Sequence, residues 1–132
     1  MAEMAMALGK IDDATKYNKQ FQDIRAHFQK TYVKPDGKIE SELQTAYCMA
    51  LSFDLLTQEQ RKQAEAHLVA RIKKDNYHLS SGFLGIPILL PTLTEMGRSD
   101  LAYRIIQNTT FPSWGYSIEQ GATTIWERWN SY

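Results

Sequence analysis

Residues 17–32 read YNKQFQDIRAHFQKTY, and the bulky apolar side chains in this stretch recur with a helical period. They are separated by steps of four, three, four and four residues: Tyr17, Phe21, Ile24, Phe28 and Tyr32. Such spacing places them on one face of a helix with 3.6 residues per turn. We therefore expect a long helix that starts near Asp12 or Asp13 and buries this aromatic stripe in a core.

The sequence after this helix predicts a turn and then a charged helix. Residues 34–38 (KPDGK) indicate the turn, because proline presets the chain and glycine allows a positive φ. Thr57 and Gln60 form a capping box, which opens a helix that reaches about Lys74. The side chains expected to face inward from it are Ala64, Leu68 and Ile72.

Apolar helices are expected on either side of the charged one, at residues 43–56 and 83–95. Pro91 should kink the second, whose residues 86–90 are apolar on all sides, as in a helix enclosed by others. A further helix follows, and its expected buried side consists of Leu101, Ala102, Ile105 and Ile106. After Asn108 the pattern becomes an irregular aromatic-rich loop. Alternating charged and apolar helices suit a two-layer ring, in which the outer helices are exposed to solvent and the inner helices are enclosed.

The composition excludes several classes of partner. Lys and Arg total 15 and Asp and Glu total 15, with the basic residues scattered along the chain. This gives no electrostatic footprint for nucleic acid or an anionic membrane, so a neutral sugar is a more natural ligand. Residues 1–8 are apolar but carry Glu3 and are too short for a signal peptide or a membrane span. The sequence therefore assigns no cellular compartment to the protein.

Neither a metal nor another cofactor is expected. His27, His67 and His78 lie far apart and show no paired spacing with cysteine or aspartate, which argues against a zinc site. No phosphate-binding glycine loop and no serine nucleophile elbow occur. Cys48 is the only cysteine and lies in an apolar helical run, so we expect a buried, inert thiol.

Residues 121–130 read GATTIWERWN and place the carboxylate of Glu127 between the indoles of Trp126 and Trp129. Indole faces pack against the apolar face of a pyranose ring, and a carboxylate held among them can work at the anomeric carbon. The alternative is a helix capping box formed by Thr124 and Glu127. On spacing alone, the capping box is favoured.

Four runs of sequence resemble the catalytic domain of bacterial α-L-rhamnosidases, in the family's order and spacing. They are QTAY at 44–47, YHLSSGFLG at 77–85, PSWGY at 112–116 and GATTIWERW at 121–129. Residues 12–17 resemble the same domain further upstream, so the likeness covers nearly the whole chain.

The resemblance implies an all-α fold in which helical hairpins form part of an (α/α)6 toroid, with residues 1–132 as a single partial domain. It implies hydrolysis of terminal α-L-rhamnose with inversion, and it makes Glu127 the general base. The family's proton donor is expected upstream of Met1, and a substrate-binding histidine beyond Tyr132, so the isolated chain should be inactive. Exposed apolar edges of such a piece would favour a homo-oligomer. The alternative is a non-catalytic helical module with a structural, self-associating or sugar-binding role.

The resemblance also implies residues that contact the rhamnose-containing carbohydrate. In the loop at 77–83, His78 is expected to donate to a sugar hydroxyl and Phe83 to stack, with Gly82 allowing close backbone approach. Without the family, it is equally reasonable that His78 caps a helix and Phe83 is core.

Further along the chain, three aromatic side chains and one acid are candidate pocket residues. Trp114 and Tyr116 either cover the core or wall a cleft, and Trp129 faces the sugar more plausibly than Trp126. Glu119 could touch substrate, although support of the loop is the favoured role.

Overall fold

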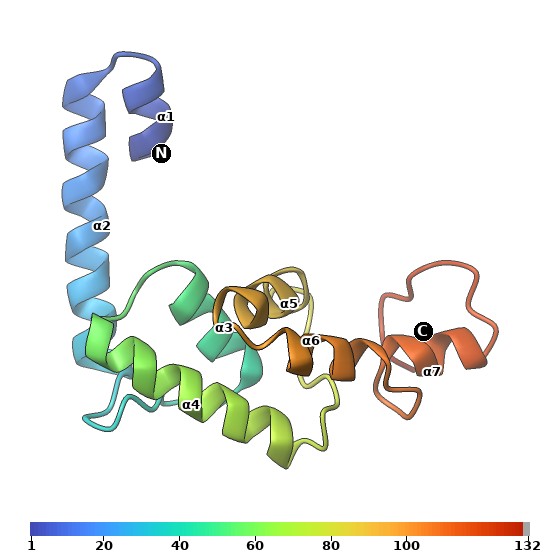
Figure 1. Ribbon diagram of the computed structural model, residues 1–132. Helices are drawn as coiled ribbons and strands as arrows, with labels where there is room; N and C mark the ends of the chain where they lie inside the picture. Colours follow the sequence, from blue (N-terminus) through green and yellow to red (C-terminus); the bar gives the residue numbers. More distant parts are fainter. Residues whose placement is uncertain (131–132) are drawn as a thin grey trace. The chain divides into compact units, whose positions relative to one another are not determined.

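The computed structural model describes residues 1–130, and within them the chain is all-helical with no extended strand (Figure 1). The seven helices are α1 (Ala2–Ala7), α2 (Ile11–Tyr32), α3 (Gln44–Ser52), α4 (Gln58–Lys74), α5 (Ile86–Glu95), α6 (Ser99–Ile106) and α7 (Trp114–Glu119). They fall into two compact units, one at residues 1–33 and the other from residue 34 onward. None of the described helices combines the length and apolarity that crossing a bilayer requires.

The first unit is a hairpin in which α1 packs against the start of α2 (Figure 1). Gly9 makes the turn between them with φ +70°. The expected long helix is confirmed and begins at Ile11. The prediction that its aromatic stripe is core is wrong: Ile24 is 54% exposed, and Ala14 is the buried residue of α2. The reason is length, since a six-residue α1 covers only the N-terminal turns of α2.

The second unit has its core where α3 packs on α4 and α5, and α5 packs on α6. The capping box of α4 is present: the Thr57 hydroxyl accepts from the Gln60 N–H at 3.2 Å, and Gln60 Oε1 accepts from the Thr57 N–H at 3.0 Å. The three predicted inward side chains are fully buried: Ala64, Leu68 and Ile72. The predicted turn is also confirmed, with Gly37 at φ +74°.

The helix α5 starts at Ile86, three residues later than expected, with Pro87 in its first turn and Pro91 inside it. Only one face of α5 is enclosed, because Leu89 and Leu93 are fully buried while Pro87 is exposed. In α6 the predicted buried side is confirmed except for Ile106, which is 45% exposed.

Cys48 lies fully buried on α3, as predicted, and burial raises the pKa of its thiol to about 12. A thiol with so high a pKa carries almost no thiolate near neutral pH and is chemically quiet.

The short helix α7 lies where the sequence indicated an irregular loop. The hydroxyl of Ser113 caps it by accepting from the Tyr116 N–H at 3.0 Å. Within the second unit, α7 packs closely against none of the other described helices and lies beyond the end of α6 (Figure 1). Its position therefore depends on the loop that precedes it.

Candidate functional site

Two adjoining hollows lie along the segment that runs from α7 to residue 129. The larger is lined by that segment alone, and the smaller also reaches the start of α5 and the loop before it. The larger has a volume of about 300 Å³ and the smaller about 170 Å³. They share four lining residues: Trp114, Ile125, Trp126 and Trp129. The smaller hollow, called the aromatic pocket below, is also lined by Phe83 and Glu127.

The aromatic pocket brings together four of the residues expected at the site. Phe83 comes from the loop before α5, Trp114 from the first residue of α7, and Glu127 and Trp129 from the chain after α7. The rings of Trp114 and Trp129 meet edge to face, with centroids 5.7 Å apart and an interplanar angle of 81°. This arrangement suits the quadrupoles of the two rings and leaves indole surface toward the hollow. Trp126 lines the hollow together with Trp129, although the sequence favoured Trp129 alone.

Glu127 is exposed to solvent and lies in a segment without helix. Residues 121–130 contain no helical turn, so the capping-box interpretation of Thr124 and Glu127 is wrong. The two hollows have no other aspartate or glutamate among the residues that line them. The carboxylate of Glu127 is thus the one acidic group that borders the aromatic pocket in the described chain.

A buried hydrogen-bond network fixes the loop between α4 and α5. Gln44 is fully buried; its Nε2 donates to Asp75 Oδ2 at 2.9 Å and to the His78 carbonyl at 3.0 Å. Its Oε1 accepts from the Ser80 N–H at 3.2 Å. Asp75 Oδ2 also accepts from Arg71 Nε and from Ser80 Oγ, both at 2.8 Å. The network ties the start of α3 and the end of α4 to the loop that carries Phe83.

The charge of Asp75 is stabilised within this network. Burial by itself would raise the pKa of the Asp75 carboxyl group. The hydrogen bonds from its three donors and the positive charge of Arg71 outweigh that effect, so the pKa lies below its ordinary value. No local pattern in the sequence signals this network, because Gln44 and Asp75 are 31 residues apart.

His78 lines neither the aromatic pocket nor the larger hollow beside it. Its Nδ1 bonds to the Asp75 carbonyl at 3.0 Å and its Nε2 to Thr110 Oγ1 at 2.7 Å. It borders a separate hollow of about 330 Å³, where Arg104 lies over the Tyr77 ring at 3.6 Å from the centroid. Its expected sugar contact stays a prediction.

Glu119 and Tyr116 also lie outside the lining of the two hollows. Glu119 is exposed at the last residue of α7. Tyr116 is half-buried and meets Phe111 edge to face at 5.3 Å between ring centroids. A supporting role for Glu119 in this segment stays a prediction.

Within the described chain, close packing against the glycine backbone occurs at Gly85, and the expected approach of a sugar at Gly82 stays a prediction. A Cβ atom on Gly85 would lie 2.5 Å from Thr45 Oγ1, whereas one on Gly82 would meet nothing within 4 Å. Gly85 therefore allows the start of α5 to lie against α3, and this contact helps position the loop that carries Phe83. No group of three or more His, Cys, Asp or Glu side chains among the described residues could hold a metal ion.

Comparison with known proteins gives one consistent family. The model of the bacterial alpha-L-rhamnosidase 6 hairpin glycosidase domain matches residues 1–132. An α-L-rhamnosidase of Streptomyces avermitilis is 51% identical over 98% of the chain, and one of Formosa agariphila is 44% identical over 99%. The chain spans only 12% and 14% of the length of these two relatives.

Solved structures agree with the sequence comparison. The crystal structure of the Streptomyces avermitilis α-L-rhamnosidase complexed with L-rhamnose superposes with a TM-score of 0.94 over 98% of this chain and 12% of that one. The Aspergillus terreus α-L-rhamnosidase, 35% identical, gives 0.95 over 99% of this chain and 15% of that one. The predicted all-α, six-hairpin type of fold is confirmed. The chain belongs to the bacterial α-L-rhamnosidase six-hairpin glycosidase family.

Proposed function

We propose that this chain supplies the general base and part of the sugar pocket of an α-L-rhamnosidase, which hydrolyses terminal α-L-rhamnose from glycosides or polysaccharides with inversion. The observation that carries the proposal is the position of Glu127 on a hollow walled by Phe83, Trp114 and Trp129. Family membership supports the reaction class.

The aromatic walls would bind the sugar through its apolar face. Rings that approach from two separate segments, before α5 and after α6, can hold a pyranose between them. A deoxy sugar with a methyl group at C5 adds apolar surface to such contacts. Positioning of this kind is what fixes the anomeric carbon relative to the catalytic groups.

Glu127 would act on water. In an inverting glycosidase the base removes a proton from a water molecule as that water attacks the anomeric carbon, on the face opposite the leaving group. An exposed carboxylate at the rim of an aromatic pocket has room for that water. The partner acid must stand roughly 6.5–9.5 Å away to protonate the leaving oxygen.

The lining of the two hollows includes a single carboxylate, so we expect the chain alone to be inactive. Incubation with an aryl α-L-rhamnoside should release no phenol above the uncatalysed rate. Turnover that disappears in Glu127→Gln would contradict this expectation, because it would mean that the chain also contains the acid.

Sugar binding can be tested in the chain itself. All three of its tryptophans, Trp114, Trp126 and Trp129, line the hollows, so tryptophan fluorescence reports on this site alone. L-rhamnose should change the emission in a saturable way, and Trp129→Ala should weaken the binding, whereas His27→Gln on the exposed surface of α2 should not. No response to L-rhamnose, or equal binding by Trp129→Ala, would count against the pocket.

A further inference from the structure

Two loops lead into opposite walls of the aromatic pocket. The loop between α4 and α5 leads to Phe83, and the loop between α6 and α7 leads to Trp114. Since α7 packs closely against no other described helix, the second loop decides where Trp114 stands. The separation of the two aromatic walls therefore depends on how these loops are joined.

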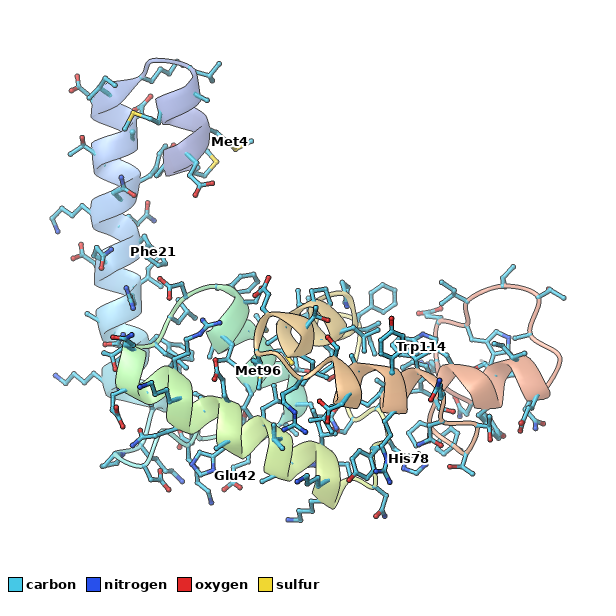
Figure 2. All side chains as sticks on the ribbon, in the orientation of Figure 1. Met4, Phe21, Glu42, His78, Met96 and Trp114 are labelled. Carbon is cyan, nitrogen blue, oxygen red and sulfur yellow. The ribbon has the colours of Figure 1, made fainter. Side chains whose placement is uncertain are left out.

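Three hydrogen bonds join the loops a few residues before the pocket. Asn108 Nδ2 donates to the Tyr77 carbonyl at 3.4 Å, and the Leu79 N–H donates to the Pro112 carbonyl at 3.3 Å. The third and shortest links the side chains of His78 and Thr110 at 2.7 Å. His78 precedes Phe83 by five residues and Thr110 precedes Trp114 by four. His78 and Trp114 are labelled in Figure 2.

The shortest bond belongs to a chain of hydrogen bonds centred on Thr110. The Asn108 amide is oriented by its Nδ2 bond to Tyr77 and by the Thr110 N–H, which donates to Asn108 Oδ1 at 3.1 Å. The Thr110 hydroxyl oxygen lies 2.8 Å from the same Oδ1 and 2.7 Å from His78 Nε2. The hydroxyl thus stands between the Asn108 amide and the His78 ring.

The other ring nitrogen of His78 is also engaged. The carbonyl oxygen of Asp75 can only accept, so Nδ1–H donates to it at 3.0 Å. Both ring nitrogens are therefore engaged by the protein. The same Asp75 belongs to the buried network around Gln44, which anchors the His78 side of the link.

Close packing on the other side transmits the position of the loop to α7. A Cβ atom on Gly115 would lie 2.5 Å from the Asn108 carbonyl oxygen and 3.0 Å from Thr109 Cα. The first turn of α7 thus rests directly on the backbone next to Thr110. Moving Thr110 would move the helix that begins with Trp114.

We propose that His78 is a positioning residue, which braces the two loops through Thr110 and so sets the spacing of Phe83 and Trp114 in the aromatic pocket. The proposal deepens the proposed function and rests on it only where sugar affinity is concerned. In this role His78 acts on sugar binding through the positions of Phe83 and Trp114.

The brace is tested first without sugar, by near-ultraviolet circular dichroism of the 132-residue chain. The edge-to-face pair of Trp114 and Trp129 should dominate this signal, because the chain contains only three tryptophans. His78→Ala and Thr110→Val should lose most of it while far-ultraviolet helicity is kept. His78→Gln, whose amide can take the place of Nε2, should retain it better than His78→Asn, whose amide can take the place of Nδ1 only.

His27→Gln is the matched control, since His27 is exposed on α2 and should leave the signal unchanged. An unchanged signal in Thr110→Val would overturn the proposal, even if His78→Ala fails to fold. Equal effects of His78→Gln and His78→Asn would do the same, because they would show that the bond to Thr110 carries no special weight.

The second arm measures L-rhamnose affinity by tryptophan fluorescence. His78→Ala and Thr110→Val should weaken binding about three- to tenfold, which corresponds to one lost hydrogen bond, and His78→Gln should restore most of it. Unchanged affinity in both variants would overturn the link to the pocket. If L-rhamnose does not bind the unmodified chain, the proposed function fails. The near-ultraviolet circular dichroism of the variants still tests whether the His78–Thr110 bond positions the two loops.

Discussion

Asp75 is the residue on which the loop before the aromatic pocket depends most. Replacing it with alanine would leave one of the two N–H groups of the buried Gln44 amide without an acceptor and would free Arg71 and Ser80 from their shared partner. We expect Asp75→Ala to lower the free energy of unfolding by about 2–4 kcal/mol, measured by urea denaturation. Asp23→Ala, which removes an exposed ion pair with Lys19, should change it little. A loss no larger than that of Asp23→Ala would contradict the central place of the network.

The same carboxylate should make stability depend on acid. The pKa of Asp75 is lowered in the folded chain, so its contribution is present above the unfolded value of about 3.9 and is lost as the pH falls through the folded value. Between about pH 5 and pH 3, the unmodified chain should therefore lose more stability than Asp75→Asn. The pKa of Asp100 is also lowered, to about 2, chiefly by its hydrogen bond from Arg98. Asp100 is present in both proteins, so the difference between their thermal midpoints isolates Asp75. Parallel pH profiles would contradict the assignment.

Among the helices, α4 was the most predictable because its signals are local. Its start is encoded by Thr57 and Gln60, and both reciprocal bonds of the box are formed. Thr57→Ala should cost about 1 kcal/mol of stability in urea denaturation, whereas Thr57→Ser keeps the acceptor and should cost much less. Equal losses for the two variants would mean that the hydroxyl does not cap the helix.

Other elements show where local patterns stop being informative. The helix α7 was missed because Pro112 and Gly115 are typical of loops, although Ser113 supplied a capping signal. The aromatic stripe of α2 predicted the helix correctly but not its burial, since periodicity shows which side chains share a face and not what covers that face. The resemblance proposed a set of site residues, and the aromatic pocket groups Phe83, Trp114, Glu127 and Trp129, whereas His78 and Glu119 lie outside it. The Gln44 network could not be predicted, because its partners meet only after folding.

For the molecule as a whole, the exposed apolar side chains predict self-association. Met4, Leu8 and Ile24 are more than half exposed in the first unit, as are Phe83 and Ile125 in the second. Sedimentation equilibrium should give a mass that rises above 15.2 kDa with concentration. A double change of Leu8 and Ile24 to serine should lower this tendency. A monomer at every concentration would contradict the prediction.

Testing whether Glu127 is the general base requires a protein that also supplies the general acid. A chimera can provide it, in which this chain replaces the matching segment of the Streptomyces avermitilis α-L-rhamnosidase, 51% identical and superposable with a TM-score of 0.94. The unmodified chimera should hydrolyse an aryl α-L-rhamnoside and release β-L-rhamnose first, as inversion requires. Glu59→Gln serves as the matched control, since Glu59 is exposed on α4 and lies outside the lining of both hollows.

The most direct test is the rate of that chimera after Glu127→Gln and Glu127→Ala. Loss of the base should lower kcat by about a hundredfold or more. Azide should rescue the alanine variant: its nitrogen bonds to the anomeric carbon as the bond to the aryl oxygen breaks, giving the β-configured rhamnosyl azide. A near-normal rate in Glu127→Gln, with Glu59→Gln equally active, would contradict the assignment of Glu127 as the base.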